Sequence, residues 1–228
     1  MELGTDQAAK GPESSLAAEE TMMKALARMS VCAVTLLMAS CGGKVLRPHY
    51  YALEIPPAPA QAVSDARLPG TVAVRRFETP GYLRQGRIVY RPTPEEIGFY
   101  EYHRWAADPA ETVTTTVIDS LRSTRVFSRV KRYDGQNQQD YLMVGRLERL
   151  EEIDYGGPIR VEAKVSAELV NLRTGATEWT GNSSEASRVD NRNINSVVVA
   201  MNRAVQNSID RLVVGLDQQL QAKSQVVK

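Results

Sequence analysis

The chain has few of the side chains that enzymes use to move protons or to attack substrates. Its 228 residues include two cysteines, Cys32 and Cys41, and two histidines, His49 and His103. The histidines lie 54 residues apart in segments predicted to be edge strands, so each is interpreted as a partly exposed structural residue. The motifs G-x-S-x-G and H-E-x-x-H and a Walker-type lysine are absent. The sequence therefore predicts no metal, no cofactor and no enzymatic activity.

The chain also lacks a strong excess of charge of either sign. Its 28 Lys and Arg against 27 Asp and Glu give a formal net charge of +1. Nucleic-acid binding usually needs a concentrated basic surface, so we expect no nucleic-acid partner. The densest basic cluster either complements the end of a helix or meets anionic lipid headgroups or an acidic partner. Its members are Arg122, Arg125, Arg129, Lys131 and Arg132.

No apolar run is long enough to cross a bilayer, but a short one lies near the N-terminus. Residues 23–29 are basic, residues 31–38 are apolar, and the small residues Ala39 and Ser40 precede Cys41. This order is typical of a bacterial export signal, and about eight apolar residues fall far short of the roughly 20 that a membrane span needs. A cysteine at this place indicates a lipoprotein signal, in which Cys41 is acylated and becomes the first residue. An ordinary signal peptide with an incidental cysteine is the alternative.

The signal divides the chain into parts. Residues 1–22 carry five acidic residues and one lysine, so we interpret them as an extension before the true start, disordered if it is made. Residues 23–40 are the predicted signal peptide, 41–48 a lipidated tether, 49–222 a single domain and 223–228 a disordered tail. Cleavage would remove Cys32, so no free thiol would remain for a disulfide.

Eight segments of the domain are predicted as strands and two as helices. The strands cover residues 49–55, 71–77, 86–91, 99–104, 126–133, 141–153, 159–169 and 178–187. The first helix begins at Asp108 and Pro109, which suit the N-cap and the first helical position, and the second covers residues 193–220. Residues 159–169 alternate apolar and polar, which is typical of a sheet with one buried face. We therefore expect an α+β two-layer sandwich, with a mostly antiparallel sheet and both helices on one face.

Adjacent acidic residues occur as Glu95-Glu96 and Glu151-Glu152. Neighbours on a strand point to opposite faces and so cannot share a proton. We interpret both pairs as solvated charges.

Aromatic residues gather before the first helix, where they either pack in the core or serve as interface anchors on an edge hairpin. With the preceding turn they form the predicted contact surface: Tyr82, Leu83, Phe99, Tyr100, Tyr102 and Trp105. We expect that replacing Tyr82 or Tyr100 with Asp would abolish partner capture without unfolding the chain.

Several segments in order carry a resemblance to a known family. They are the Cys41 signal, residues 50–53, 72–74, 80–91 and 103–106, Leu121-Arg122 and Val126-Phe127. This arrangement resembles the ABC-type transport auxiliary lipoproteins, the family of paraquat-inducible protein C-like outer-membrane lipoproteins.

The resemblance implies a non-enzymatic lipoprotein, anchored in the outer membrane and facing the periplasm. Such proteins work with MCE-domain proteins and ABC transporter or permease components in envelope lipid transport. Gly42 fits outer-membrane sorting, since inner-membrane retention usually goes with Asp after the lipidated cysteine. The leading hypothesis is a docking module, and the alternatives are a periplasmic lipid-binding carrier or a structural envelope lipoprotein. A closed homo-oligomer is compatible with docking.

Overall fold

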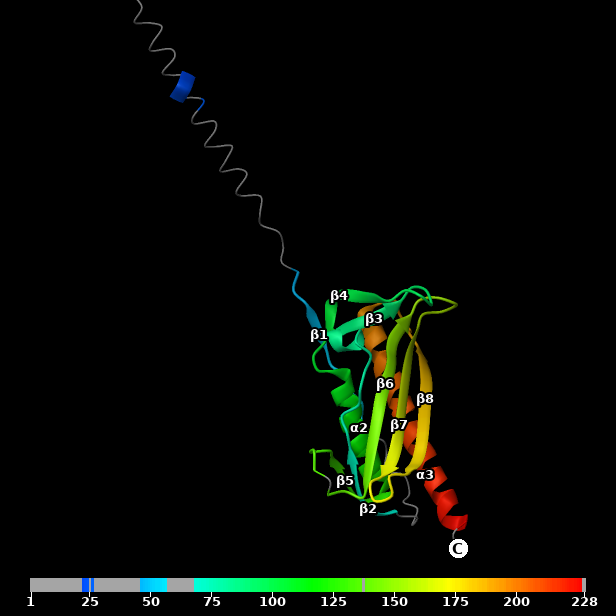
Figure 1. Cartoon of the computed structure of the whole chain (residues 1–228). Coiled ribbons are helices and arrows are strands. Elements are labelled where there is room, and N and C mark those ends of the chain that lie inside the picture. The colour runs from blue at the N-terminus through cyan, green and yellow to red at the C-terminus, as the bar shows by residue number, and fades with distance from the viewer. Residues whose placement is uncertain (1–21, 25, 27–45, 57–67, 137, 227–228) are drawn as a thin grey trace, which may run out of the picture. The chain divides into compact units, whose positions relative to one another are not determined.

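A computed structural model describes residues 22–24, 26, 46–56, 68–136 and 138–226 of the chain (Figure 1). The chain divides into two units, residues 1–46 and 47–228. Cys41 and most of the predicted signal lie outside the described residues. Within the described ranges, no helix has both the length and the hydropathy that a bilayer span requires.

The second unit is built on an eight-stranded mixed sheet. Its strands are β1 (His49–Tyr51), β2 (Leu68–Val74), β3 (Arg87–Arg91), β4 (Gly98–Trp105), β5 (Phe127–Arg132), β6 (Tyr141–Ile153), β7 (Arg160–Asn171) and β8 (Thr177–Arg188). One edge of β6 pairs along its length with β7, and β7 pairs with β8, all antiparallel. The other edge is shared, because the start of β6 pairs with β2 and its end pairs with β3. Figure 1 shows the two resulting arms at opposite ends of β6, with β2 and β5 at one end and β3, β4 and β1 at the other.

Two long helices cover one face of this sheet (Figure 1). They are α2 (Pro109–Thr124) and α3 (Ile194–Val226), and a short 3-10 helix, η2 (Leu83–Gln85), precedes β3. The start of α2 has the predicted N-cap, because the Asp108 side chain accepts a hydrogen bond of 2.8 Å from the backbone N–H of Ala110. The expected α+β fold with both helices on one face is confirmed.

The core lies between the helices and the sheet. Every second residue of β7 is buried, as the alternation predicted, and these side chains face the apolar stripe of α3. Burying each large aliphatic side chain contributes about 1.5–3 kcal/mol. Fully buried members include Val161, Val165 and Leu169 of β7 and Met201, Val205 and Ile209 of α3.

Several boundaries differ from the sequence prediction. The strand expected at residues 49–55 is reduced to β1, and α3 continues to Val226, so residues 223–226 are helical rather than a disordered tail. The strand expected at 71–77 ends at Val74, and the chain then runs beside β6 as an irregular segment. There the backbone N–H of Glu78 donates to the carbonyl of Gly145 at 2.9 Å. The long ladders of the sheet are antiparallel, whereas four shorter pairings are parallel.

Candidate functional site

The end of β6 carries two adjacent buried acidic residues. Glu151 is 0% exposed and Glu152 is 5% exposed. The prediction that this pair is solvated is therefore wrong. Because neighbouring side chains on a strand point to opposite faces, each carboxylate is covered by a different part of the fold. The only hint in the sequence is that Leu150 and Ile153 flank the pair, which gives each face of the strand an apolar neighbour.

Glu151 is held by a cation and a phenol. The Arg91 side chain donates from Nε to one carboxylate oxygen of Glu151 and from Nη2 to the other at 3.4 Å, while the Tyr82 hydroxyl donates to Oε1. Arg149 Nε lies 3.8 Å from the same carboxylate. Burial raises the pKa of Tyr82 to about 12, and its hydrogen bond to Glu151 adds to the rise. The charge of Glu151 is thus matched inside the fold.

Glu152 has a different environment. The Tyr100 hydroxyl donates to its Oε2 at 2.6 Å, and no cation among the described residues hydrogen-bonds this carboxylate. The nearby Arg192 instead donates two bonds, of 3.0 and 3.2 Å, to Asp154. Burial raises the pKa of Glu152 and the proximity of Asp154 adds to the rise, while the Tyr100 hydrogen bond and the charge of Arg192 offset it only in part. Burial is also the main cause of a raised pKa for Tyr100, which therefore stays protonated at neutral pH.

Glu152 lines a groove of about 570 Å³ between β3, β4, the end of β6 and the first turn of α3. We call this the hairpin groove. Its walls include Tyr90, Tyr100, His103, Glu152, Asp154 and Arg192. The rings of Tyr90 and Tyr100 meet edge to face with centroids 5.2 Å apart. Gly98 makes room for this arrangement, because a Cβ at that position would lie 2.3 Å from the Tyr90 ring.

The strand β1 lies beside β4 at this end of the sheet. His49 stacks on His103 with ring centroids 5.5 Å apart, and the Tyr51 hydroxyl lies 3.0 Å from His103 Nδ1. Burial and the proximity of His49 lower the pKa of His103. Although distant in sequence, the two histidines therefore meet. The end of β4 is also not a free edge, because residues 103–105 pair with β1.

The predicted contact residues divide into three groups. Leu83 and Trp105 are core side chains, at 2% and 6% exposure, and offer little to a partner. Phe99 and Tyr100 line the hairpin groove. Tyr82 covers Glu151 on the other face, and Tyr102 is half-buried outside the groove.

The hydrogen bonds of Tyr82 and Tyr100 to buried carboxylates change the result that we expect from replacing either tyrosine with Asp. An Asp at position 82 or 100 would bring a second carboxylate against a buried one, so we expect it to destabilise the chain. Loss of partner capture by such a variant could therefore result from unfolding as well as from loss of docking.

Ion pairs engage most of the basic cluster. Three of its members are paired: Arg122 with Asp119, Lys131 with Asp134 and Arg132 with Glu111. Arg122 also donates to the carbonyl of Val130 at 3.3 Å, and Arg125 ends α2 with a φ of 52°. These contacts favour the structural interpretation of the cluster.

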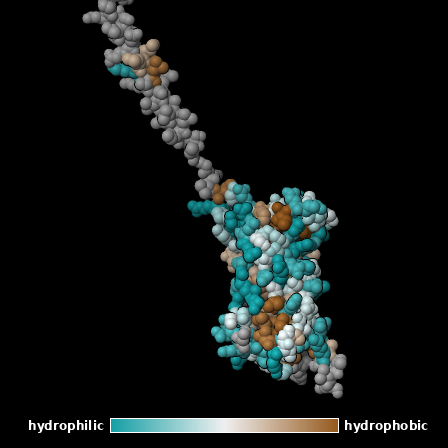
Figure 2. All heavy atoms as spheres, in the orientation of Figure 1, coloured by the Kyte–Doolittle hydropathy of each residue, from teal (hydrophilic) through white to brown (hydrophobic). Residues whose placement is uncertain are grey.

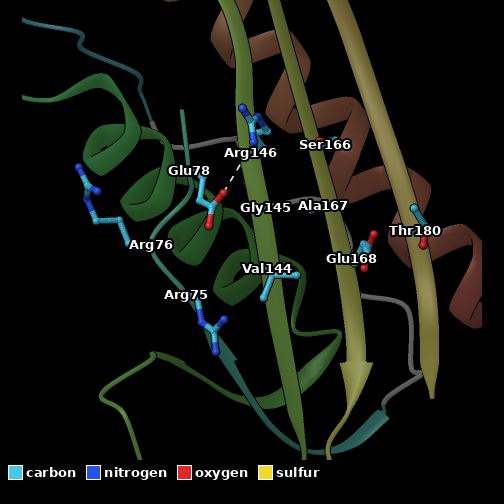
Figure 3. A pocket seen from close by; sticks show the side chains of 10 residues that line it. All are labelled: Arg75, Arg76, Glu78, Val144, Gly145, Arg146, Ser166, Ala167, Glu168 and Thr180. Atoms are coloured by element: carbon cyan, nitrogen blue, oxygen red, sulfur yellow. Dashed lines mark ion pairs between the residues drawn. The ribbon is translucent and has the colours of Figure 1, made fainter. Parts of the chain in front are cut away.

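The open face of the sheet carries a second hollow, of about 410 Å³ (Figure 3). Figure 3 shows Glu78 reaching toward Arg146, with the ion pair at 3.7 Å, while Arg76 points away toward α2. There Arg76 pairs with Asp108 at 2.5 Å. Figure 2 shows hydrophilic side chains over most of the face in view, with a compact hydrophobic area over its lower part and a smaller one near the top. The charged side chains at the hollow are exposed, so it lacks the buried charge that marks the hairpin groove.

Comparison with known proteins agrees with this fold. The model of the ABC-type transport auxiliary lipoprotein component family matches residues 51–213, from β1 into α3. The chain belongs to this family. The earlier resemblance is thereby confirmed, and the chain is an auxiliary lipoprotein of ABC-type transport.

Two solved structures share the fold of this auxiliary lipoprotein. A Xanthomonas campestris protein of family DUF330 is 19% identical, with a TM-score of 0.68 over 78% of this chain and 99% of that one. An uncharacterized protein is 13% identical, with a TM-score of 0.56 over 75% of this chain and 99% of that one. A search of curated proteins finds no match to the chain. At these identities the structures are informative about the fold alone.

Proposed function

We propose that this auxiliary lipoprotein docks the periplasmic end of an MCE-domain partner at the outer membrane, within an ABC-type lipid transport system. The observation that carries the proposal is the pairing of β1 with β4. His49, the first residue of β1, is the eighth residue after the predicted lipidation site Cys41. An extended chain spans about 3.3–3.6 Å per residue, so a tether of eight residues reaches about 30 Å at most. A tether this short would favour a partner that spans the periplasm and meets the hairpin groove near the membrane.

The groove suits binding better than catalysis. Glu152 is hydrogen-bonded by Tyr100 and Asp154 by Arg192, and Tyr100 keeps its proton at neutral pH because burial raises its pKa. Its aromatic side chains, Tyr90, Phe99 and Tyr100, are of the type that is enriched at protein interfaces. We therefore propose a non-enzymatic role.

Placement in the outer membrane rests on the sequence near Cys41. Gly42 follows the cysteine in place of the Asp that typically goes with inner-membrane retention. Several acyl chains on one residue hold a protein at a membrane far more stably than a single chain does.

A lipid-carrier role receives less support. An acyl chain needs a mainly apolar cavity, whereas charged side chains line both hollows described above.

The test is a crosslinked pull-down of the full-length lipoprotein from its own cell envelope, with partners identified by mass spectrometry. We expect an MCE-domain protein or an ABC permease in the eluate. A Cys41→Ser chain, which cannot be acylated, is the control and should lose this capture. If only lipid or bulk outer-membrane proteins appear, the docking proposal fails.

A further inference from the structure

The two buried carboxylates at the end of β6 differ in one respect. The Glu151 carboxylate receives bonds from Arg91, whereas the only donor to the Glu152 carboxylate among the described residues is the neutral hydroxyl of Tyr100. A buried carboxylate is destabilising unless it is protonated or paired with a cation. Glu152 therefore lies in the wall of the hairpin groove without a hydrogen-bonded cation among the described residues. Arg192 acts on it only through its charge, because its guanidinium bonds Asp154 instead.

We propose that the hairpin groove binds a lysine or arginine side chain of the docking partner, and that Glu152 is its counter-ion. This inference rests on the proposed docking function and adds the chemistry of the partner. A cation beside Glu152 would supply the pairing that Arg91 supplies to Glu151.

The charges around the groove favour a cationic occupant. Among the described residues that line it, the acidic groups are Glu101 from β4, Glu152 from the end of β6 and Asp154 directly after β6, and the one cation is Arg192. His103 adds no competing charge at neutral pH, because its pKa is lowered by burial and by His49 on β1. The groove thus has more negative than positive side chains.

The walls also suit a long cationic side chain. Lys and Arg bury an aliphatic stem while their charged end finds a polar partner, and cations are attracted to tyrosine ring faces. The rings of Tyr90 and Tyr100 stand beside the carboxylate, and the space of about 570 Å³ is open to an incoming side chain.

An anionic group fits the same space less well. The first turn of α3 attracts anions in principle, but one of its N–H groups, that of Ser196, already donates to the Asn193 side chain at 2.9 Å. A phosphate there would also lie among Glu101, Glu152 and Asp154. An ethanolamine headgroup brings an ammonium together with such a phosphate, so we favour the protein side chain.

The direct test is an NMR titration of the mature, acylated lipoprotein in detergent micelles, with ¹³C-labelled glutamate carboxyls. The probe is N-acetyl-lysine amide, and N-acetyl-norleucine amide is the matched uncharged control. We expect the lysine probe to shift the Glu152 resonance and the norleucine probe to leave it unchanged. No shift with the lysine probe would overturn the inference. A shift with lysophosphatidylethanolamine alone would overturn it in favour of a lipid headgroup.

The second test repeats the envelope pull-down with Glu152→Gln. The amide can still accept the Tyr100 bond, so we expect the variant to fold and to lose most partner capture, at least tenfold. Glu168→Gln, on the open face of the sheet, is the matched control and should capture normally. Equal capture by Glu152→Gln would refute the cationic contact and leave docking intact. If the wild-type chain captures no transport partner, docking itself fails, while the NMR titration still decides on the groove chemistry.

Discussion

Tyr100 and Glu152, 52 residues apart in sequence, are joined by a hydrogen bond of 2.6 Å at the hairpin groove. The bond links β4 to the end of β6, two strands that do not pair with each other. It gives the buried carboxylate its one hydrogen-bond donor among the described side chains. The groove and the local stability of the sheet therefore depend on the same pair.

Tyr100→Phe should weaken the fold without changing its shape. It removes only the hydroxyl, and leaving a buried acceptor without its donor costs about 1–3 kcal/mol. Urea unfolding of the mature lipoprotein would measure the loss. Tyr102→Phe is the control, because that tyrosine is outside the groove and should change stability by less than about 0.5 kcal/mol. Equal effects of the two variants would contradict the assigned role of Tyr100.

Arg91→Met should be the most destabilising of these changes. It leaves Glu151, at 0% exposure, without its main cation. Removing one partner of a buried ion pair costs about 3–5 kcal/mol. Arg149→Met is the matched comparison, since that guanidinium is 3.8 Å away and 42% exposed, and its loss should cost less. A smaller effect for Arg91 than for Arg149, in the same unfolding measurement, would show that Arg91 does not hold Glu151.

Many of the helices and strands could be predicted from residues that are close together in the sequence. The Asp108 cap, the alternation in β7 and the bounds of β6 are set by residues close in sequence, and the structure has all three. The parallel pairings could not be found in this way. They join segments that no short turn connects, such as β1 with β4, and this pairing brings His49 onto His103.

The candidate site could be predicted only in part. Phe99 and Tyr100 were assigned to a contact surface and do line the groove, but Leu83 and Trp105 face the core. A run of two glutamates at the end of a strand is typical of solvent exposure. The side chains that cover this pair come from positions 52 to 69 residues away, so the apolar neighbours Leu150 and Ile153 are the only local hint of its burial.

Gly145 offers a test of the contact between β6 and the irregular segment after β2. A Cβ at Gly145 would lie 2.3 Å from the ring of Phe77, which is 0% exposed and has no room to move aside. We expect Gly145→Ala to destabilise the chain by about 1–3 kcal/mol through overpacking. Gly215→Ala in α3 is the matched change, because a Cβ there has no neighbour within 4 Å. It should raise stability by about 0.5–1 kcal/mol.

The pH dependence of stability tests the charge of the buried Glu152 carboxylate directly. Burial raises the pKa of Glu152 above its ordinary value of 4.5, and Asp154 adds to the rise. An acid whose pKa is higher in the folded chain stabilises the fold fully below the unfolded pKa, and this contribution is lost as the pH rises through the folded value. The wild type should therefore lose stability relative to Glu152→Gln as the pH rises from about 4.5 toward neutral.

Urea unfolding of both chains at a series of pH values would measure this difference. Glu168→Gln, which replaces an exposed carboxylate, should follow the wild type throughout. If the wild type and Glu152→Gln keep a constant difference, the Glu152 carboxyl has a counter-ion already and the groove needs no cation. If the difference grows with pH and the lysine probe then reduces it in the wild type alone, the loss of stability and the binding of the cation arise from the same carboxylate.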